Sequence, residues 1–263
     1  YKYNDHLFKN LSAVRDKINS SKDILKISNE IEDLEKEITI FHAQISNEII
    51  ENSELDIVFI GFHGQTIFHS VEESISKQLG DGNLLSQRTK KKVIYNFRQN
   101  DLKNGGEGAP LAPIYHKLLV KKNMIKTPVT ILNIGGISNI THIDSNYKMI
   151  SFDIGPGNCL IDKWIRSNSD DQFDDNGNIA KAGKIDKFIL EQSLDNFYYS
   201  SISKKKSLDI NDFDITFARG LSLENGAATI TDFTAHILSK NFLDNDIYVC
   251  GGGRKNEFLL NSI

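Results

Sequence analysis

The sequence predicts an α/β protein in which β-hairpins are mixed with strand–helix units. Three observations lead to this fold class. Apolar runs of strand type recur along the chain, amphipathic segments of helical period stand between them, and several of the runs end in glycine, at Gly61, Gly135, Gly155 and Gly251. Strand ends of this kind that gather at one cleft are typical of ligand sites between domains, so the glycines direct the search for function.

The composition excludes several classes of protein. The chain has 263 residues, of which 39% are hydrophobic and 25% charged, and a net charge of −4, so no positive field favours nucleic acid. The two cysteines, Cys159 and Cys250, lack CxxC spacing, which argues against a disulfide scaffold and favours a reducing cytoplasm. No apolar stretch reaches the roughly 18 residues of a membrane span. The chain does not begin with Met, and we expect a fragment.

The first 50 residues predict helices. Apolar residues at helical spacing predict one over 5–18, and Ser20 and Ser21 are plausible caps for the next. From Ile24 to Ile49 the apolar steps alternate between three and four, which is nearly a heptad pattern. A coiled-coil helix that binds a partner is one interpretation. A helix packed along the side of its own domain is the other, and the short length of the pattern favours it.

Residues 55–61 predict a strand that leads into His63-Gly64-Gln65-Thr66. A glycine-bearing turn at 80–83, a helix, a strand over 92–97 and a helix over 113–119 follow. The polar link at 121–123 suggests a domain boundary there. We therefore expect an N-terminal domain over residues 1–125 and a C-terminal domain over 126–263.

Two glycine turns organise the second half of the chain. The sequence predicts a strand over 129–134 that ends in Gly135-Gly136, and a second over 150–154 that ends in Gly155-Pro156-Gly157. The segment between them is expected to complete a β-hairpin. A helix is expected from Leu160. A glycine turn that leads into a helix N-terminus favours an anion, because free amides and the helix dipole point at it. Together with one carboxylate, Asp153, this suggests phosphoryl transfer.

The remainder of the chain predicts an acidic loop over 170–178, a helix over 183–194 and a Ser/Lys-rich loop over 200–206. An amphipathic helix over 224–242 and a strand over 246–250 follow. That strand runs into Gly251-Gly252-Gly253, with a last helix beginning after it. Bare backbone at the triple glycine suits a flat ring or a ribose, although a tight turn is the simpler explanation.

Asp153 is the first candidate catalytic residue. An aspartate where a strand gives way to glycines can take a proton, orient water or hold Mg²⁺. It can also be an Asx-turn residue that only satisfies local amides. The recurrence of glycine-ended strands favours a function.

A second group of candidates follows the strand over 55–61. The imidazole of His63, the amide of Gln65 and the hydroxyl of Thr66 suit a polar ligand such as a sugar, and a solvated hairpin turn is the alternative. His63, His69 and Asp81 together suggest a metal site, although no helical spacing aligns them. Arg98, which with Asp101 flanks a predicted turn, can clamp an anion or form a structural ion pair.

Five motifs resemble those of the anhydro-N-acetylmuramic acid kinases, in that family's order and at about its spacing. They are His63-Gly64-Gln65-Thr66, Gly105-Gly106-Glu107-Gly108-Ala109-Pro110-Leu111, Leu132-Asn133-Ile134-Gly135-Gly136-Ile137-Ser138-Asn139, Phe152-Asp153-Ile154-Gly155-Pro156-Gly157-Asn158 and Val249-Cys250-Gly251-Gly252-Gly253. The resemblance covers the chain from about Leu55 onward and, more weakly, the helices before it.

The resemblance implies an actin-like (ribonuclease H-like) two-domain fold of the sugar kinase and Hsp70 type, with mixed sheets and ATP in the cleft. It also implies the conversion of 1,6-anhydro-N-acetylmuramic acid, ATP and water to N-acetylmuramic acid 6-phosphate in bacterial cell-wall recycling, with Mg²⁺. Asp153 matches the general base. The residues that this resemblance places on the sugar side are His63, Gln65, Thr66, Arg98 and Asp101. Arg98 is expected to bind the lactyl carboxylate. The residues expected to bind ATP are Asn133, Gly135, Gly136, Gly155, Gly157, Asn158, Gly251, Gly252, Gly253 and Asn256.

The chain also departs from the family pattern. A Ser-Gly-Thr-Ser phosphate loop and a C-terminal acidic segment are missing, Ile154 stands where Thr is usual, and Lys206-Ser207-Leu208-Asp209 keeps only the first two residues of Lys-Ser-Thr-Gly-Arg-Glu. We therefore expect a fold that is incomplete at both ends.

Two alternative functions stay open. One is a sugar- or nucleotide-binding module without phosphoryl transfer, and the other is a metal-dependent hydrolase that uses His63, His69 and Asp81. A cytoplasmic protein is expected, with no membrane or nucleic-acid partner. A homodimer through the 24–49 pattern is left open.

Overall fold

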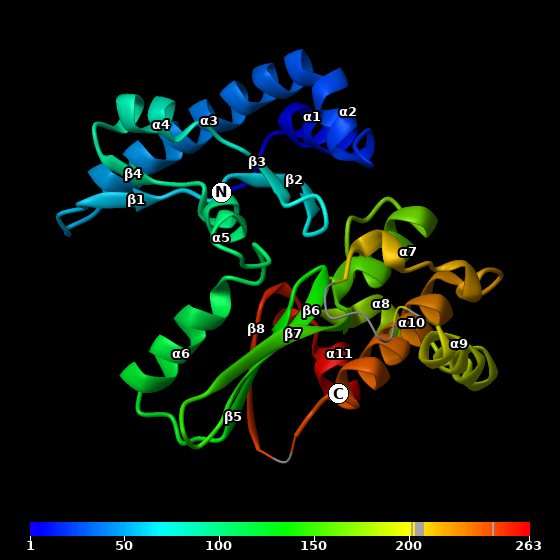
Figure 1. The fold of residues 1–263 in the computed structure, drawn as a ribbon. Helices are drawn as coiled ribbons and strands as arrows, with labels where there is room; N and C mark the ends of the chain where they lie inside the picture. Colours follow the sequence, from blue (N-terminus) through cyan, green and yellow to red (C-terminus); the bar gives the residue numbers. More distant parts are fainter. Residues whose placement is uncertain (201, 203–207, 244) are drawn as a thin grey trace. The chain divides into compact units, whose positions relative to one another are not determined.

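The computed structural model describes residues 1–200, 202, 208–243 and 245–263. The chain forms two compact units, Tyr1–Leu111 and Ala112–Ile263 (Figure 1). The boundary at Leu111 precedes the helix α6 (Ala112–Lys122), which the sequence analysis placed in the first domain. In the structure His116 of α6 contacts Thr141 of the second unit, Nδ1 to Oγ1 at 2.8 Å. Each unit is therefore described on its own.

Three helices begin the first unit: α1 (Asp5–Asp16), α2 (Ser21–Lys26) and α3 (Ser28–Glu51). The predicted first helix is confirmed, and the side chain of Asn4 caps it by accepting the Leu7 N–H at 2.8 Å. Along the near-heptad pattern, Ile31, Leu34 and Ile38 are buried in a cluster with residues of α1 and of the neighbouring hairpin. At these positions the coiled-coil interpretation is wrong, because the apolar side chains face their own unit.

The strands of the first unit are short. β1 (Phe59–Gly61) pairs in parallel with β4 (Lys92–Ile94), and β2 (Gln65–Ser70) pairs antiparallel with β3 (Ile75–Leu79). Only the last residues of the strand predicted over 55–61 are in a strand. Gln65 and Thr66, for which a solvated hairpin turn is the alternative interpretation, belong to β2, because the hairpin begins directly after Gly64.

Two short helices complete this unit. α4 (Gly82–Thr89) is capped by the carboxylate of Asp81, which accepts the N–H groups of Asn83 and Leu84. α5 (Phe97–Lys103) replaces the turn predicted around Arg98 and Asp101. The helix starts at Asn96, whose left-handed backbone (φ 59°) turns the chain out of β4. Arg98 and Asp101 therefore lie on one short helix.

A four-stranded mixed sheet forms the centre of the second unit, in the order β7-β6-β5-β8. The strands are β5 (Val129–Ile134), β6 (Ile137–Ile143), β7 (Met149–Pro156) and β8 (Asp246–Cys250). β6 pairs antiparallel with both β5 and β7, which confirms the predicted hairpin, and β8 pairs in parallel with β5. Because β5 and β8 run in the same direction, their carboxyl ends meet at one edge of the sheet.

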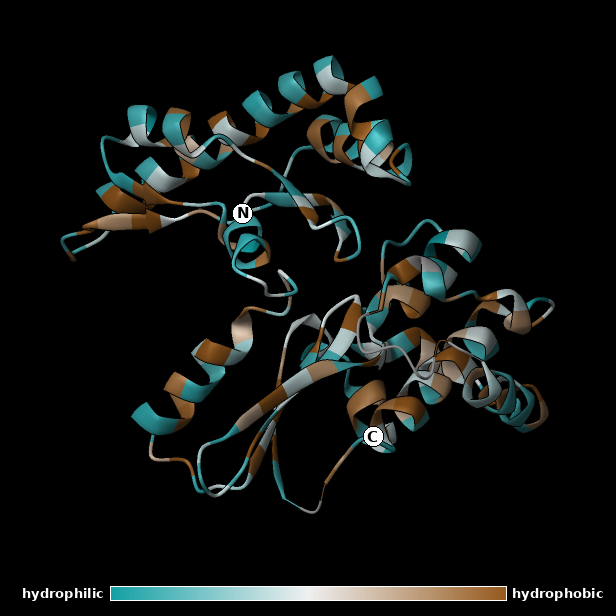
Figure 2. Ribbon diagram, in the orientation of Figure 1, coloured by the Kyte–Doolittle hydropathy of each residue, from teal (hydrophilic) through white to brown (hydrophobic). Residues whose placement is uncertain are grey.

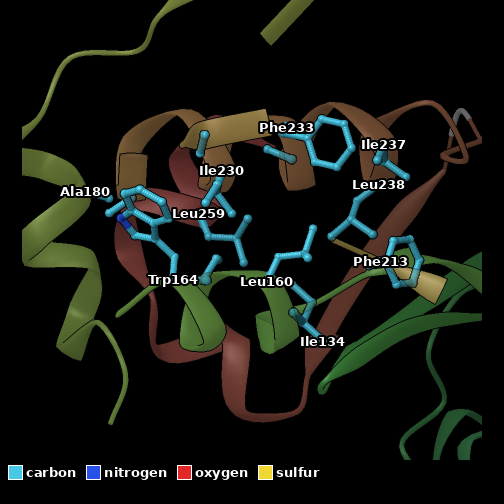
Figure 3. Packing of buried hydrophobic residues seen from close by; sticks show 14 of the residues in the cluster. Ile134, Leu160, Trp164, Ala180, Phe213, Ile230, Phe233, Ile237, Leu238 and Leu259 are labelled. Atoms are coloured by element: carbon cyan, nitrogen blue, oxygen red, sulfur yellow. The ribbon is translucent and has the colours of Figure 1, made fainter. Parts of the chain in front are cut away.

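Two helices cover one face of this sheet, α7 (Asn158–Asn168) and α10 (Leu223–Ser239). Figure 3 shows their apolar side chains packed together, with Leu160 and Trp164 from α7 against Ile230 and Phe233 from α10. Val120 of α6 packs on the other face, in a cluster with Val129, Ile131 and Ile143. β5 is buried along nearly its whole length because both faces of the sheet are covered there.

The second unit also contains the helices α8 (Asn178–Ala182), α9 (Lys187–Tyr199) and α11 (Glu257–Ser262). Its 3₁₀ turns include η1 (Asp175–Gly177), η3 (Ile210–Asp212), η4 (Thr216–Ala218) and η5 (Gly252–Lys255). The helix predicted over 183–194 begins later, because Asp186 caps it by accepting the Ile189 N–H. Most of the predicted loop over 200–206, with the Lys206-Ser207 pair, lies outside the described residues. Within the described ranges, no helix has the length and apolar character of a membrane span.

Candidate functional site

Three glycine turns come together in the second unit, at the edge where β5 and β8 end. A methyl group added to Gly157 would lie 2.3 Å from the carbonyl oxygen of Gly135, and one added to Gly251 would lie 2.4 Å from that of Ile134. At Gly253 it would lie 2.2 Å from the Ile134 side chain. These distances leave no room for a Cβ, so glycine is required for the turns to pack on one another.

The N-terminus of α7 does not offer the free amides that the sequence predicted. Asn158 N–H donates to the carbonyl of Gly135 at 2.8 Å, and the N–H groups of Gly157 and Cys159 donate to that of Gly136 at 2.8 and 3.1 Å. These three amides are therefore not available to an anion, because the first glycine turn already satisfies them. The same bonds lock the two turns together. Binding of ATP at Gly157 and Asn158 stays a prediction.

What remains open at this edge is the tip of the first turn. Gly136 is exposed, and its N–H makes no hydrogen bond with a described residue. The side chain of Asn158 lies beside the triple glycine, with Nδ2 3.7 Å and Oδ1 3.3 Å from added methyl groups at Gly252 and Gly253. A free amide, an amide side chain and bare backbone are groups that fit a nucleotide phosphate and ribose. Asn256 differs, since its Oδ1 caps α11 by accepting the Leu259 N–H.

Asp153 lies on β7 beside a β-bulge. Ser138 pairs with Gly155 and the next residue, Asn139, pairs with Asp153, so Ile154 is the extra residue. Bulges are frequent next to active sites, where they re-aim a side chain. Ile154 and its neighbour Phe152 pack on the core under α7 and α10, and Asp153 lies on the opposite face of the sheet because side chains alternate along the strand.

The Asp153 carboxylate has one hydrogen bond, in which its Oδ2 accepts the N–H of Leu208 at 2.9 Å. Burial raises the pKa of Asp153, and the Leu208 N–H lowers it, with burial the larger effect. A carboxylate whose pKa is raised toward neutrality is a better general base. Sequence analysis did not identify the contribution of Leu208, because a backbone N–H leaves no signal in residue identity.

In the first unit, Arg98 and His63 form a hydrogen-bonded pair. Arg98 Nε donates to His63 Nε2 at 2.8 Å, and Arg98 Nη1 donates to the Gly108 carbonyl at 3.2 Å. Because a guanidinium has no acceptor, His63 Nε2 must carry the lone pair, and its Nδ1–H therefore donates to the Gly64 carbonyl at 2.9 Å. Both ring nitrogens of His63 are thus engaged in hydrogen bonds.

Arg98 has no ion-pair partner in the part of the chain that the structure describes. Burial lowers its pKa, which expresses the cost of holding this charge away from water. Asp101 does not pair with it. Asp101 Oδ2 instead accepts the Gly108 N–H at 2.8 Å and so fixes the Gly-Gly-Glu-Gly loop. A half-buried cation without a counter-charge is typical of a site for an anionic ligand.

The other predicted sugar-side residues have partners within the first unit. Gln65 Nε2 donates to the Tyr3 hydroxyl at 2.9 Å, and Thr66 Oγ1 accepts from Gln78 Nε2 at 3.2 Å. The structure does not support the metal-dependent hydrolase. In the described part of the chain no group of three or more His, Cys, Asp or Glu side chains could hold a metal ion. Asp81 is used as a helix cap and His63 as an acceptor for Arg98.

Comparison with known proteins connects these two clusters to one family. The family model described as anhydro-N-acetylmuramic acid kinase matches residues 3–263. An anhydro-N-acetylmuramic acid kinase of Pelagibacter ubique (strain HTCC1062) is 51% identical over 274 residues, which cover 100% of this chain and 73% of that protein. The anhydro-N-acetylmuramic acid kinases of Rhodospirillum rubrum and Methylobacterium nodulans are each 38% identical to this chain. The matches cover 89% and 88% of this chain, respectively, and 63% of each relative.

These matches confirm the resemblance drawn from the five motifs and the predicted fold class, an α/β protein of the actin-like, sugar-kinase type with mixed sheets. The chain spans 73% of one relative and 63% of the two others. The motifs that carry the family resemblance include both the turns of the second unit and the Arg98–His63 cluster of the first. The chain belongs to the anhydro-N-acetylmuramic acid kinase family.

Proposed function

We propose that this protein phosphorylates 1,6-anhydro-N-acetylmuramic acid with ATP and water, giving N-acetylmuramic acid 6-phosphate and ADP. The family match supports the reaction class, and the environment of the Asp153 carboxylate supports the mechanism. Its carboxylate is largely buried, has a raised pKa and keeps Oδ1 free of hydrogen bonds with described residues.

In this mechanism Asp153 Oδ1 accepts a proton from a water molecule as the water oxygen attacks C1 of the sugar. The bond between C1 and the bridging oxygen breaks, and the freed O6 accepts the γ-phosphoryl group of ATP. The Leu208 N–H holds the carboxylate so that one oxygen faces the water. The Gly136 amide and the triple glycine are proposed contacts of ATP. Mg²⁺ would supply charge neutralisation on the phosphates.

Arg98 is proposed to bind the lactyl carboxylate of the sugar. Its guanidinium is oriented by hydrogen bonds to His63 and to the Gly108 carbonyl. The Gly108 carbonyl is positioned by the loop that Asp101 holds through the Gly108 N–H. Orientation matters because a guanidinium binds a carboxylate through a planar fork. His63 and Asp101 then contribute to sugar binding chiefly through Arg98. The free cysteines Cys159 and Cys250 fit the cytoplasm, where we place this reaction. A homodimer stays a prediction.

The first experiment measures ADP release with ATP, Mg²⁺ and anhydro-N-acetylmuramic acid. It uses this chain and a longer polypeptide extended to the length of the relatives. In the active form, Asp153→Asn is expected to lower kcat by about a thousandfold, the usual range for loss of a general base. Asp246→Asn, at the exposed start of β8, is the matched control and keeps its activity. Sugar binding without turnover in either polypeptide would contradict phosphoryl transfer.

A second experiment tests the assignment of Arg98. Arg98→Lys keeps the charge but loses the fork, so affinity for anhydro-N-acetylmuramic acid is expected to fall about tenfold to a hundredfold. Affinity for anhydro-N-acetylglucosamine, which lacks the lactyl group, should not change. Arg88→Lys on the exposed face of α4 is the control. An equal loss of affinity for both sugars would show that Arg98 does not bind the lactyl carboxylate.

A further inference from the structure

The pairing of the central sheet places polar side chains in a row across its strands. Asp153 on β7 is directly opposite Asn139 on β6, Asn139 is opposite Asn133 on β5, and Asn133 is opposite Cys250 on β8. Residues directly opposite one another in a sheet project from the same face, with Cβ atoms about 4.5–5.5 Å apart. Asn139 is therefore the side chain next to Asp153 across the strands.

The bulge at Ile154 ends this register. From Met149 to Asp153 the partners on β6 run in unbroken order from Ile143 to Asn139, and the ladder shifts by one residue only between Asn139 and Ser138. The Asn139–Asp153 pair is therefore the last pair before the bulge, where the ladder hydrogen bonds are interrupted. The backbone thus brings one carboxylate and one amide side by side.

Both groups have unused polar atoms. Asp153 Oδ1 and the side-chain amide of Asn139 make no hydrogen bond with any residue that the structure describes. Asn139 is half-buried and so retains access to a small molecule. Asn133 differs, since its Oδ1 accepts from the Cys250 thiol at 3.7 Å. Of the two asparagines in the row, Asn139 is the one directly opposite Asp153, and neither its Oδ1 nor its Nδ2 has a hydrogen bond with a described residue.

We infer that Asn139 is a second contact for the group that Asp153 deprotonates, its side-chain amide forming a hydrogen bond with the same oxygen atom. The inference rests on the proposed function. As the O–H proton passes to Asp153 Oδ1, the amide holds that oxygen in line for attack and itself neither gains nor loses a proton. An amide suits this place because a second carboxylate would oppose the ionisation of Asp153.

The first test measures the geometry without any substrate. In the 263-residue chain, the Asp153 carboxyl carbon is followed by NMR as the pH is varied, and its signal is assigned by its loss in Asp153→Asn. Asn139→Asp is expected to move the Asp153 titration upward by about one pH unit or more, because a like charge is placed opposite it. Asn146→Asp adds the same charge at the exposed turn of the same hairpin and should leave the titration in place. Equal titrations in the two variants would overturn the inference.

The second test measures contact with the ligand. Asn139→Ala is expected to weaken binding of anhydro-N-acetylmuramic acid by calorimetry, or to lower kcat/KM, about tenfold to a hundredfold, with circular dichroism checking the fold. Asn146→Ala is the control. In the active polypeptide, loss of Asn139 should leave the pH dependence of kcat unchanged, whereas Asn139→Asp shifts its acidic limb upward.

The outcomes separate the inference from the proposed function. If the parent releases no ADP but Asn139→Ala still weakens sugar binding, phosphoryl transfer is wrong and the Asn139 contact stands. If the parent turns over and Asn139→Ala matches Asn146→Ala in both binding and kcat/KM, the Asn139 contact is wrong and the kinase stands.

Discussion

The two units of this chain use very different sheets. The second unit has one four-stranded sheet with apolar clusters on both faces, and its core includes Leu132, Trp164, Ile230 and Leu238. The first has two separate two-stranded sheets. In the parallel one, Phe59 and Ile94 are 56% and 48% exposed. Figure 2 shows β1 and β4 in the hydrophobic colour although these side chains are not covered.

The difference indicates where each unit gets its stability. Parallel strands are usually covered on both faces, and two-stranded sheets are marginal by themselves. The β1–β4 pair therefore adds little to the first unit. The burial of Ile31, Leu34 and Ile38 between α1, α3 and the β2–β3 hairpin adds most. We expect the second unit to unfold later than the first, and the following changes test this comparison.

The largest effect is expected for Trp164→Ala. This residue is 4% exposed, is surrounded by the core of the second unit and donates Nε1–H to the Leu223 carbonyl at 2.9 Å. Loss of the ring leaves a cavity and should lower the free energy of unfolding by about 3–5 kcal/mol, measured by urea and circular dichroism. Phe188→Ala, at a position 74% exposed, is the control and should be nearly neutral. Equal effects would mean that Trp164 is not in a rigid core.

Ile38→Ala tests whether the units unfold separately. Ile38 is fully buried, and its truncation should destabilise the first unit by about 2–5 kcal/mol. The single tryptophan, Trp164, reports on the second unit alone. The first circular dichroism transition is therefore expected to move to lower urea while the fluorescence transition stays in place. Ile49→Ala, half-exposed on the same helix, is the control. A matching shift in fluorescence would show that the units unfold together.

The glycines at strand ends give a smaller and more local comparison. Gly157→Ala should destabilise the second unit by about 1–3 kcal/mol, because its methyl group meets the Gly135 carbonyl. Gly61→Ala in the first unit meets no atom within 4 Å, and a change within about 0.5 kcal/mol is expected. Urea unfolding of the two variants measures the difference. A neutral Gly157→Ala would mean that the turns are not locked together.

The smallest effect concerns pH. Burial raises the pKa of Asp162 to about 6, partly offset by Arg166, so the folded second unit binds this proton more tightly than the unfolded chain. The stability from this group is complete below pH 4 and is lost as the pH rises through about 6. Asp162→Asn should therefore stabilise the unit at pH 8 by about 1 kcal/mol, a value reduced because solvent screens this partly exposed group, and not at pH 4.

The pH prediction also distinguishes the units. In the first unit the shifted carboxyl is Asp23, whose pKa is lowered to about 2 by Lys26, Ser20 and the Asn19 N–H. Its stabilisation is lost only as the pH falls below about 4 toward 2. Between pH 6 and 4 acidification should therefore favour the second unit without weakening the first through this group. Urea titrations at pH 4, 6 and 8 measure both, and a parallel response would contradict the assignment.

Much of the fold could be predicted from the sequence, since hydrophobic period and glycine turns are local signals. The helix over 5–18, the β5–β6–β7 meander, α10 and β8 follow from such patterns. The first unit was predicted less well. The α5 segment reads as a turn in the sequence because the helix has only seven residues. The strand predicted over 55–61 has only three residues in the structure, because few residues of a neighbouring strand pair with it.

The sequence by itself determined the family, through motifs in which each residue type has a separate physical reason, and it determined Asp153 as the candidate base. Only the tertiary structure showed that the α7 amides are satisfied by the first glycine turn, that Arg98 donates a hydrogen bond to His63, and that the pairing of β6 with β7 sets Asn139 beside Asp153. These are contacts between segments far apart in the chain, or they depend on the register in which two strands pair. Residue identities do not encode them, because many partners can supply the same N–H or carbonyl group.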